Sequence, residues 1–249
     1  MNRFFNRQWQ CLIYHIVINP QKTMSSIIPQ ASLFIGIIPA LIVLYIGLKG
    51  YEGHFKDKLI FLTFIVGIII GFVSAVIELL TQNIGLLLYI ILFPILEQLF
   101  KTIILNIGRF QEKQETTIYG LSLGLGFGSV FTPAAIILGN FQEINISFIA
   151  AIIGSFGIIL FHAGTGVIIG YGVYAHKLSR YLTIAILSHF VITTVIGVTN
   201  LFQIAYLQII LVIYGIMVYW YATKRIMPRI LSESQRRKRT QKEINIKSK

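Results

Sequence analysis

Four ionisable side chains lie deep inside apolar stretches of the chain. They are Glu97 and Lys101 within FPILEQLFK (residues 93–101), His162 within LFHAGTG and His189 within AILSHFVITT. An ionised group at the centre of a bilayer costs about 2.5–3.5 kcal/mol on insertion scales, and such groups usually face a bundle interior and serve a function. These four residues are therefore the first candidates for chemistry.

A carboxylate and two histidines are suited to hydrolysis. Glu97 can polarise a water molecule that His162 and His189 help to position. The same three side chains can instead hold a metal ion, because Glu and His are ordinary zinc ligands. A third interpretation is structural: Glu97 and Lys101 are four residues apart and share a helical face, so they can form an ion pair.

Several other chemistries are excluded by missing residues. The only aspartate, Asp57, lies in a loop, which excludes an intramembrane aspartyl dyad. The zinc-protease pattern H-E-x-x-H does not occur, and GFGS at 126–129 lacks the order of the rhomboid motif G-x-S-G. A single cysteine, Cys11, excludes an internal disulfide framework and a Cys-rich metal site.

The elements that must position these residues are membrane spans. The chain is 55% hydrophobic and 12% charged, with a mean hydropathy of +0.77, which a soluble domain of this size does not show. Seven stretches reach the length of about 20 residues that a helix needs to cross a bilayer. The predicted spans are 28–48, 59–80, 84–106, 117–139, 147–174, 181–199 and 203–223.

We therefore predict an all-α polytopic membrane helix bundle with about seven transmembrane helices. Residues 26–223 form the transmembrane domain, preceded by an amphipathic interfacial segment at 1–25 and followed by a basic cytoplasmic tail at 224–249. Trp9 and Ile13 share one face of the first segment, which we expect to lie in the membrane plane as a helix ending near Pro20.

The distribution of charge predicts the orientation. The loops after the first, third and fifth spans contain Lys or Arg, whereas the intervening loops contain none. The positive-inside rule then places the N-terminus outside and the C-terminus in the cytoplasm. Of the formal net charge of +12, +8 lies in residues 224–249, where no aromatic residue is present to stack on bases. This tail predicts contact with membrane lipids and no nucleic-acid partner.

Glycines recur every four residues in several spans and predict where helices approach closely. The fourth span carries three such glycines, and the fifth carries a pair, as the second does at Gly67 and Gly71. We expect the fourth and fifth spans at the centre of the bundle. Their glycines are Gly120, Gly124 and Gly128 in the fourth span, and Gly166 and Gly170 in the fifth.

The depths of the candidate residues predict a single site. At about 1.5 Å of rise per residue, Glu97 and His189 lie ~14 Å and ~12 Å from the cytoplasmic ends of their spans, and His162 lies ~20 Å from its own. These depths overlap within the uncertainty of the span ends. We therefore expect the three side chains to meet between the third, fifth and sixth spans.

Four short motifs, one per successive span, resemble those of a superfamily of intramembrane proteases. The superfamily comprises PrsW-type and YhfC-type proteins, CAAX-processing and bacteriocin-processing enzymes, and the scaffold subunit of gamma-secretase. The resemblance covers roughly residues 85–195. FPILEQLFK resembles the E-E-x-x-K motif at Glu97 and Lys101, with Gln98 at the second acidic position. His162 and His189 resemble the histidines of the later motifs.

The remaining motif departs from the superfamily pattern. YGLSLGLGFGSVFT (119–132) resembles the segment G-F-x-x-x-E-N through Gly126 and Phe127. Phe131 and Thr132, however, stand where Glu and Asn are expected, and Thr193 stands where the last motif often has Asn. If the missing acid is essential, the chain is a catalytically silent relative.

The resemblance implies roles for the candidate residues. Glu97, His162 and His189 would activate water to hydrolyse a peptide bond of a membrane-protein or peptide substrate. Lys101 would support them as counter-charge or hydrogen-bond donor. The alternative is a scaffold or chaperone of partner membrane subunits, since the fourth span also resembles a helix of the gamma-secretase subunit. A small transporter, with the same charges as an ion relay, is the third interpretation.

Overall fold

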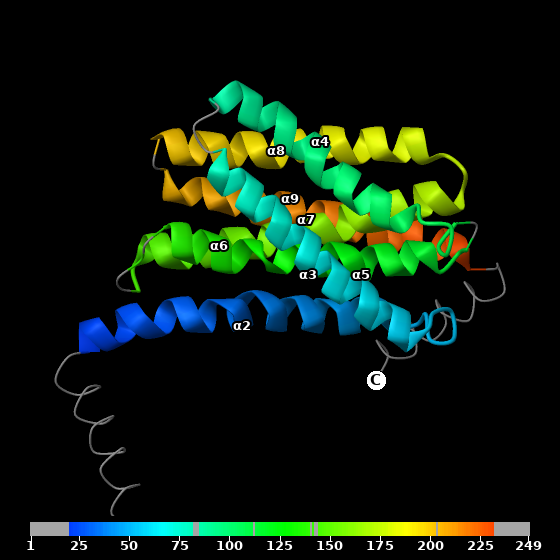
Figure 1. Cartoon of the computed structure of the whole chain (residues 1–249), viewed down its shortest axis with the longest axis horizontal. Helices are drawn as coiled ribbons and strands as arrows, with labels where there is room; N and C mark the ends of the chain where they lie inside the picture. Colours follow the sequence, from blue (N-terminus) through cyan, green and yellow to red (C-terminus); the bar gives the residue numbers. More distant parts are fainter. Residues whose placement is uncertain are drawn as a thin grey trace, which may run out of the picture.

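The computed structural model describes residues 20–81, 85–111, 113–139, 141, 144–202 and 204–231, and every regular element among them is helical. Figure 1 shows these helices packed into one bundle. The predicted all-helical class is confirmed. The elements are α2 (Pro20–Leu48), α3 (Asp57–Leu80), α4 (Leu86–Leu105), α5 (Thr116–Ser129), α6 (Phe131–Leu138), α7 (Ile146–Tyr174), α8 (Leu178–Phe202), η1 (Ala205–Leu207), α9 (Gln208–Tyr221), η2 (Ala222–Ile226) and η3 (Met227–Ile230).

The bundle has the surface of an integral membrane protein. Six segments of the described chain are long and apolar enough to cross a membrane, and α2 adds the shorter apolar stretch Ser32–Leu48. Large apolar side chains point outward from several helices; Phe34 and Phe61 are each 66% exposed and Leu187 is 57% exposed. Exposing such surface to water costs roughly 25 cal/mol per Å². These faces therefore contact lipid.

Helix boundaries differ from the predicted spans in three places. The first span, predicted at 28–48, is part of α2, which already begins at Pro20. The span predicted at 117–139 consists of two helices, α5 and α6, which meet at Val130. The span predicted to end at 223 is followed by further helical turns that continue to Ile230. They continue because Met227, Ile230 and Leu231 are buried in the main apolar core.

The two terminal predictions fall largely outside the described residues. Of the predicted interfacial segment, residues 1–19 lie outside them, and residues 20–25 already belong to α2. Of the predicted tail, residues 232–249 also lie outside.

The glycine-rich helix α5 is the centre of the bundle, and all fourteen of its residues are buried. A Cβ atom at Gly124 would overlap the carbonyl oxygen of His162 in α7, so only glycine permits this approach. On another side of α5, a Cβ atom at Gly67 of α3 would likewise overlap the backbone carbonyl of Leu123. The predicted packing role of the glycines is confirmed. The further α5–α7 contacts are Gly120 with Gly166, Gly128 with Ile159, and Gly170 with Thr116.

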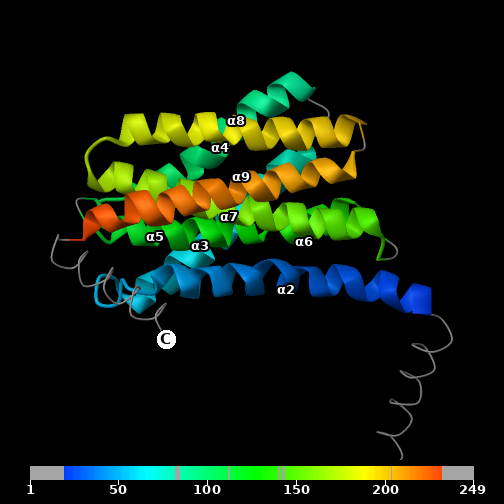
Figure 2. The same ribbon diagram turned by 180° about the vertical axis from the view of Figure 1, so that it is seen from behind.

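The remaining helices surround this centre. Figure 1 shows α3 and α4 crossing the bundle obliquely, with α8 beside α4. Figure 2 shows α9 against α7 on the opposite face, where Gly215 lies against the carbonyl of Gly157. This arrangement brings the middle parts of α3, α4, α7 and α8 together around one interior point.

Candidate functional site

The candidate site lies at that interior point and is removed from the surface. Glu97 and Lys101 come from α4, His162 from α7 and His189 from α8. Glu97 is 2% exposed, Lys101 0%, His162 1% and His189 2%. Each side chain therefore needs its polar partners from the protein itself.

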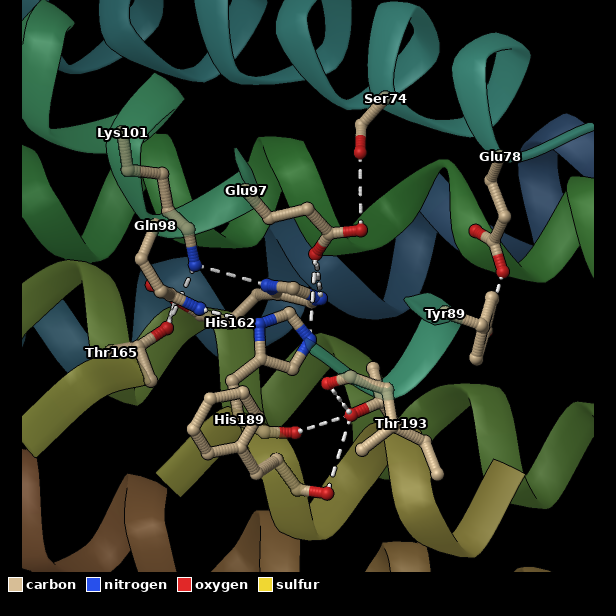
Figure 3. A network of polar contacts seen from close by, with 12 residues as sticks. Ser74, Glu78, Tyr89, Glu97, Gln98, Lys101, His162, Thr165, His189 and Thr193 are labelled. Atoms are coloured by element: carbon tan, nitrogen blue, oxygen red, sulfur yellow. Dashed lines mark hydrogen bonds and ion pairs between the residues drawn. The ribbon is translucent and has the colours of Figure 1, made fainter. Parts of the chain in front are cut away.

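One carboxylate oxygen faces both histidines (Figure 3). Glu97 Oε2 lies 3.6 Å from His162 Nε2 and 3.5 Å from His189 Nε2. The imidazole rings are nearly perpendicular, at 88°, with centroids 5.2 Å apart. One ligand atom from each of the three residues lies within 4.8 Å of the other two. The predicted convergence of the three residues is confirmed.

The other carboxylate oxygen is bonded to α3. Ser74 Oγ donates a hydrogen bond of 3.0 Å to Glu97 Oε1, whereas Glu97 Oε2 has no hydrogen-bond partner among the described residues. Sequence reasoning missed Ser74. A signal was present, because Ser74 continues the face of α3 that carries Gly67 and Gly71, and all three are buried.

The far nitrogen of each imidazole contacts a residue of α4. Lys101 Nζ lies 3.0 Å from His162 Nδ1, and Gln98 Nε2 lies 2.8 Å from His189 Nδ1. Lys101 Nζ also donates a hydrogen bond of 2.8 Å to Thr165 Oγ1. Gln98 and Lys101, predicted as supporting residues, thus each contact a different histidine.

The direct ion pair between Glu97 and Lys101, one of the three interpretations of these residues, does not form. Both residues are described, and no N–O contact within 4.0 Å joins them; the pairs formed by Glu97 are with the two histidines. The ring of His162 contacts Lys101 through its Nδ1 atom and Glu97 through its Nε2 atom. Spacing along one helix allowed a direct pair, but the ring of His162, contributed by α7, lies between the two charges.

Aromatic side chains enclose the histidines. Phe127 of α5 and Phe161 of α7 lie against His162, with ring centroids 4.8 Å and 5.4 Å from it. Phe161 also contacts His189 at 5.0 Å. Phe131 of α6 stacks on His162 at 5.2 Å with an interplanar angle of 12°. At the position where the resemblance expects Glu, the chain therefore places an apolar wall against a site histidine.

Three further polar residues lie beside the site: Glu78 of α3, Tyr89 of α4 and Thr193 of α8. Tyr89 OH donates a hydrogen bond of 2.6 Å to Glu78 Oε1, away from the histidines in Figure 3. Thr193, where the resemblance expects Asn, hydrogen-bonds the carbonyl oxygens of His189 and Phe190 in its own helix. The same hydroxyl also lies 3.5 Å from the carbonyl oxygen of Ile90 in α4. Thr193 therefore contacts backbone carbonyls of α8 and α4, and it leaves the carboxylate of Glu97 to the histidines and Ser74.

The donor set resembles that of a zinc site in residue types. Two histidines and one glutamate are an ordinary zinc ligand set, and their ligand atoms are close enough to share one ion. Zinc also requires that each coordinating nitrogen present a lone pair, so the partner of the other ring nitrogen matters.

Comparisons of the chain with protein-family models, with curated proteins and with solved structures find no match. The geometry of the site is therefore the basis for proposing a function.

Proposed function

We propose that the protein is an intramembrane peptide hydrolase in which Glu97 activates water. The observation that carries the proposal is the position of Glu97 Oε2, a buried carboxylate oxygen that faces His162 Nε2 and His189 Nε2 at 3.6 Å and 3.5 Å. A base beside two nitrogen groups that can stabilise negative charge is an arrangement that can hydrolyse a peptide bond. The ordered resemblance of the motifs to intramembrane proteases supports the same activity.

The reaction proceeds with Glu97 as both base and acid. Glu97 takes a proton from water as the water oxygen attacks the carbonyl carbon of the peptide bond. The carbonyl oxygen becomes negative and accepts hydrogen bonds from the imidazoles. When the C–N bond breaks, the protonated Glu97 returns its proton to the leaving amine, which restores the carboxylate.

The position of the site sets the class of substrate. The catalytic side chains lie in the interior of a bundle whose outer faces contact lipid. The substrate is therefore a membrane-embedded or membrane-associated polypeptide segment. We further propose that the N-terminus is outside and the C-terminus cytoplasmic. The basic segments follow the C-terminal ends of four elements, namely α2, α4, α7 and η3. Figures 1 and 2 show these C-terminal ends together at one end of the bundle.

The experiment is a comparison of wild type with Glu97→Gln in proteoliposomes that contain a pool of synthetic single-span peptides. New peptide termini are identified by mass spectrometry. We expect termini with wild type and none with Glu97→Gln. Glu78→Gln is the matched control, because it alters a partly buried carboxylate that contacts Tyr89 and not the histidines. Equal cleavage by Glu97→Gln, or no cleavage by wild type, contradicts the proposal.

A second candidate is a catalytically silent scaffold or chaperone of partner membrane subunits. The observation that favours it is Phe131, which stacks on His162 where the superfamily carries an acid. In a scaffold, Glu97→Gln changes stability and partner binding while no peptide is cleaved by either protein. The proteoliposome experiment distinguishes the two candidates.

A further inference from the structure

We infer that Lys101 and Gln98 act as positioning residues that set the tautomers of His162 and His189. In this arrangement both rings direct Nε2–H groups toward Glu97, so the cluster is a hydrogen-bond-donor site. A neutral imidazole carries a proton on one nitrogen and a lone pair on the other. The partner of Nδ1 therefore decides what Nε2 presents.

The surroundings of Lys101 Nζ show that it donates to His162. Thr165 Oγ1 accepts from Nζ at 2.8 Å, while the Thr165 hydroxyl proton is directed to the carbonyl oxygen of His162 at 3.2 Å. The ring of Phe127 presents its face to Nζ, with the centroid 5.1 Å away. With His162 Nδ1, these partners give the three N–H bonds of an ammonium group three acceptors. His162 Nδ1 is then the acceptor, and its proton lies on Nε2.

Gln98 makes the corresponding contact with the second histidine, His189. Its amide nitrogen lies 2.8 Å from His189 Nδ1, and an amide NH₂ group is a donor only. His189 Nδ1 therefore accepts, and the proton of this ring also lies on Nε2. Because Gln98 and Lys101 are three residues apart on α4, a single helical face contacts both rings.

The consequence is a carboxylate surrounded by donors. Ser74 donates to Glu97 Oε1, and the two Nε2–H groups face Oε2. An oxyanion that forms beside Glu97 meets the same two N–H groups. The catalytic role of these N–H groups rests on the proposed function, whereas the assignment of the tautomers is independent of it.

The same arrangement opposes a metal ion. A zinc ion on either Nε2 needs a lone pair there and moves the ring proton to Nδ1, which then requires an acceptor. The groups at Nδ1 are the donor nitrogens of Lys101 and Gln98. The residue types thus match a zinc site, but Lys101 and Gln98 set tautomers opposite to those that zinc binding at Nε2 requires.

The tautomers can be read directly by ¹⁵N NMR of histidine-labelled, full-length protein in detergent micelles, with signals assigned from His162→Gln and His189→Gln. We expect both site histidines to show an unprotonated Nδ1 and a protonated Nε2. In Gln98→Glu, a carboxylate acceptor replaces the donor at His189. His189 should then move its proton to Nδ1, while His162 is the internal control and stays unchanged.

Lys101→Met provides a second variant if Gln98→Glu does not fold. It removes the donor at His162 Nδ1, so the ¹⁵N signal of that nitrogen should shift toward the value of a nitrogen without a hydrogen bond, while His189 stays unchanged. A titration with Co²⁺ adds an independent readout: wild type should show no visible bands of a tetrahedral site, and Gln98→Glu should gain affinity. A wild-type Nδ1–H at either histidine, or a tetrahedral Co²⁺ site in wild type that Glu97→Gln abolishes, overturns the inference. None of these outcomes depends on whether a peptide is cleaved.

Discussion

Phe131 stacks on the imidazole of His162, with ring centroids 5.2 Å apart and planes 12° apart. The pair joins α6 to α7 beside the carboxylate of Glu97. Phe131 therefore helps to hold the ring whose Nε2 faces Glu97, in addition to filling space. This relationship leads to the first prediction.

Phe131→Leu should lower the free energy of unfolding by about 0.5–1.5 kcal/mol, because it removes the ring pair while keeping an apolar side chain. It should also change the NMR signal of the His162 ring. The measurements are denaturation in detergent and ¹⁵N spectra. Phe148→Leu is the control, since Phe148 pairs with Phe141 in a separate cluster. The role of Phe131 is contradicted if both variants leave the His162 signal unchanged.

Ser74→Ala should destabilise the protein more than Ser155→Ala does. Ser74 donates to the carboxylate of Glu97 from another helix, and a hydrogen bond to a charged group contributes about 1.5–3 kcal/mol. Ser155 is also buried but bonds the carbonyl of Ile152 in its own helix. Comparing the two denaturation midpoints in detergent tests this difference. Equal losses would show that the Ser74–Glu97 bond adds nothing to stability.

Gly124→Ala should disrupt the contact between α5 and α7. The added Cβ would overlap the backbone carbonyl of His162, and overpacking of this kind costs about 1–3 kcal/mol. The same displacement should move the His162 ring away from Glu97, so cleavage should fall along with stability. Gly108→Ala is the control, because no atom lies within 4 Å of its added Cβ. A fully stable and active Gly124→Ala protein would contradict the close packing.

The proposed orientation predicts the labelling of single cysteines in a Cys11→Ser background. In intact cells, Ile144→Cys should react with a membrane-impermeant maleimide. Lys58→Cys should react only after lysis. Both positions are exposed; Ile144 precedes α7 and Lys58 lies in the first turn of α3. Figure 1 shows the beginnings of these two helices at opposite ends of the bundle. The reverse pattern would invert the topology and place the basic tail outside.

The sequence by itself determined which segments are long and apolar enough to cross a membrane. Hydropathy is a local property, so the predicted spans agree with the helices over most of their length, including α7 at Ile146–Tyr174. The glycine patterns of α5 and α7 were equally local, and they correctly indicated the central contact of the bundle.

Only the tertiary structure decided which groups touch. Spacing along α4 allowed a direct pair between Glu97 and Lys101, but the packing of α7 places His162 between them. Ser74 became a partner of Glu97 because α3 crosses α4 at that level. Which nitrogen of each ring faces Glu97 depends on how separate helices are turned toward one another. That rotation is set by packing between segments far apart in the chain, so no single span encodes it.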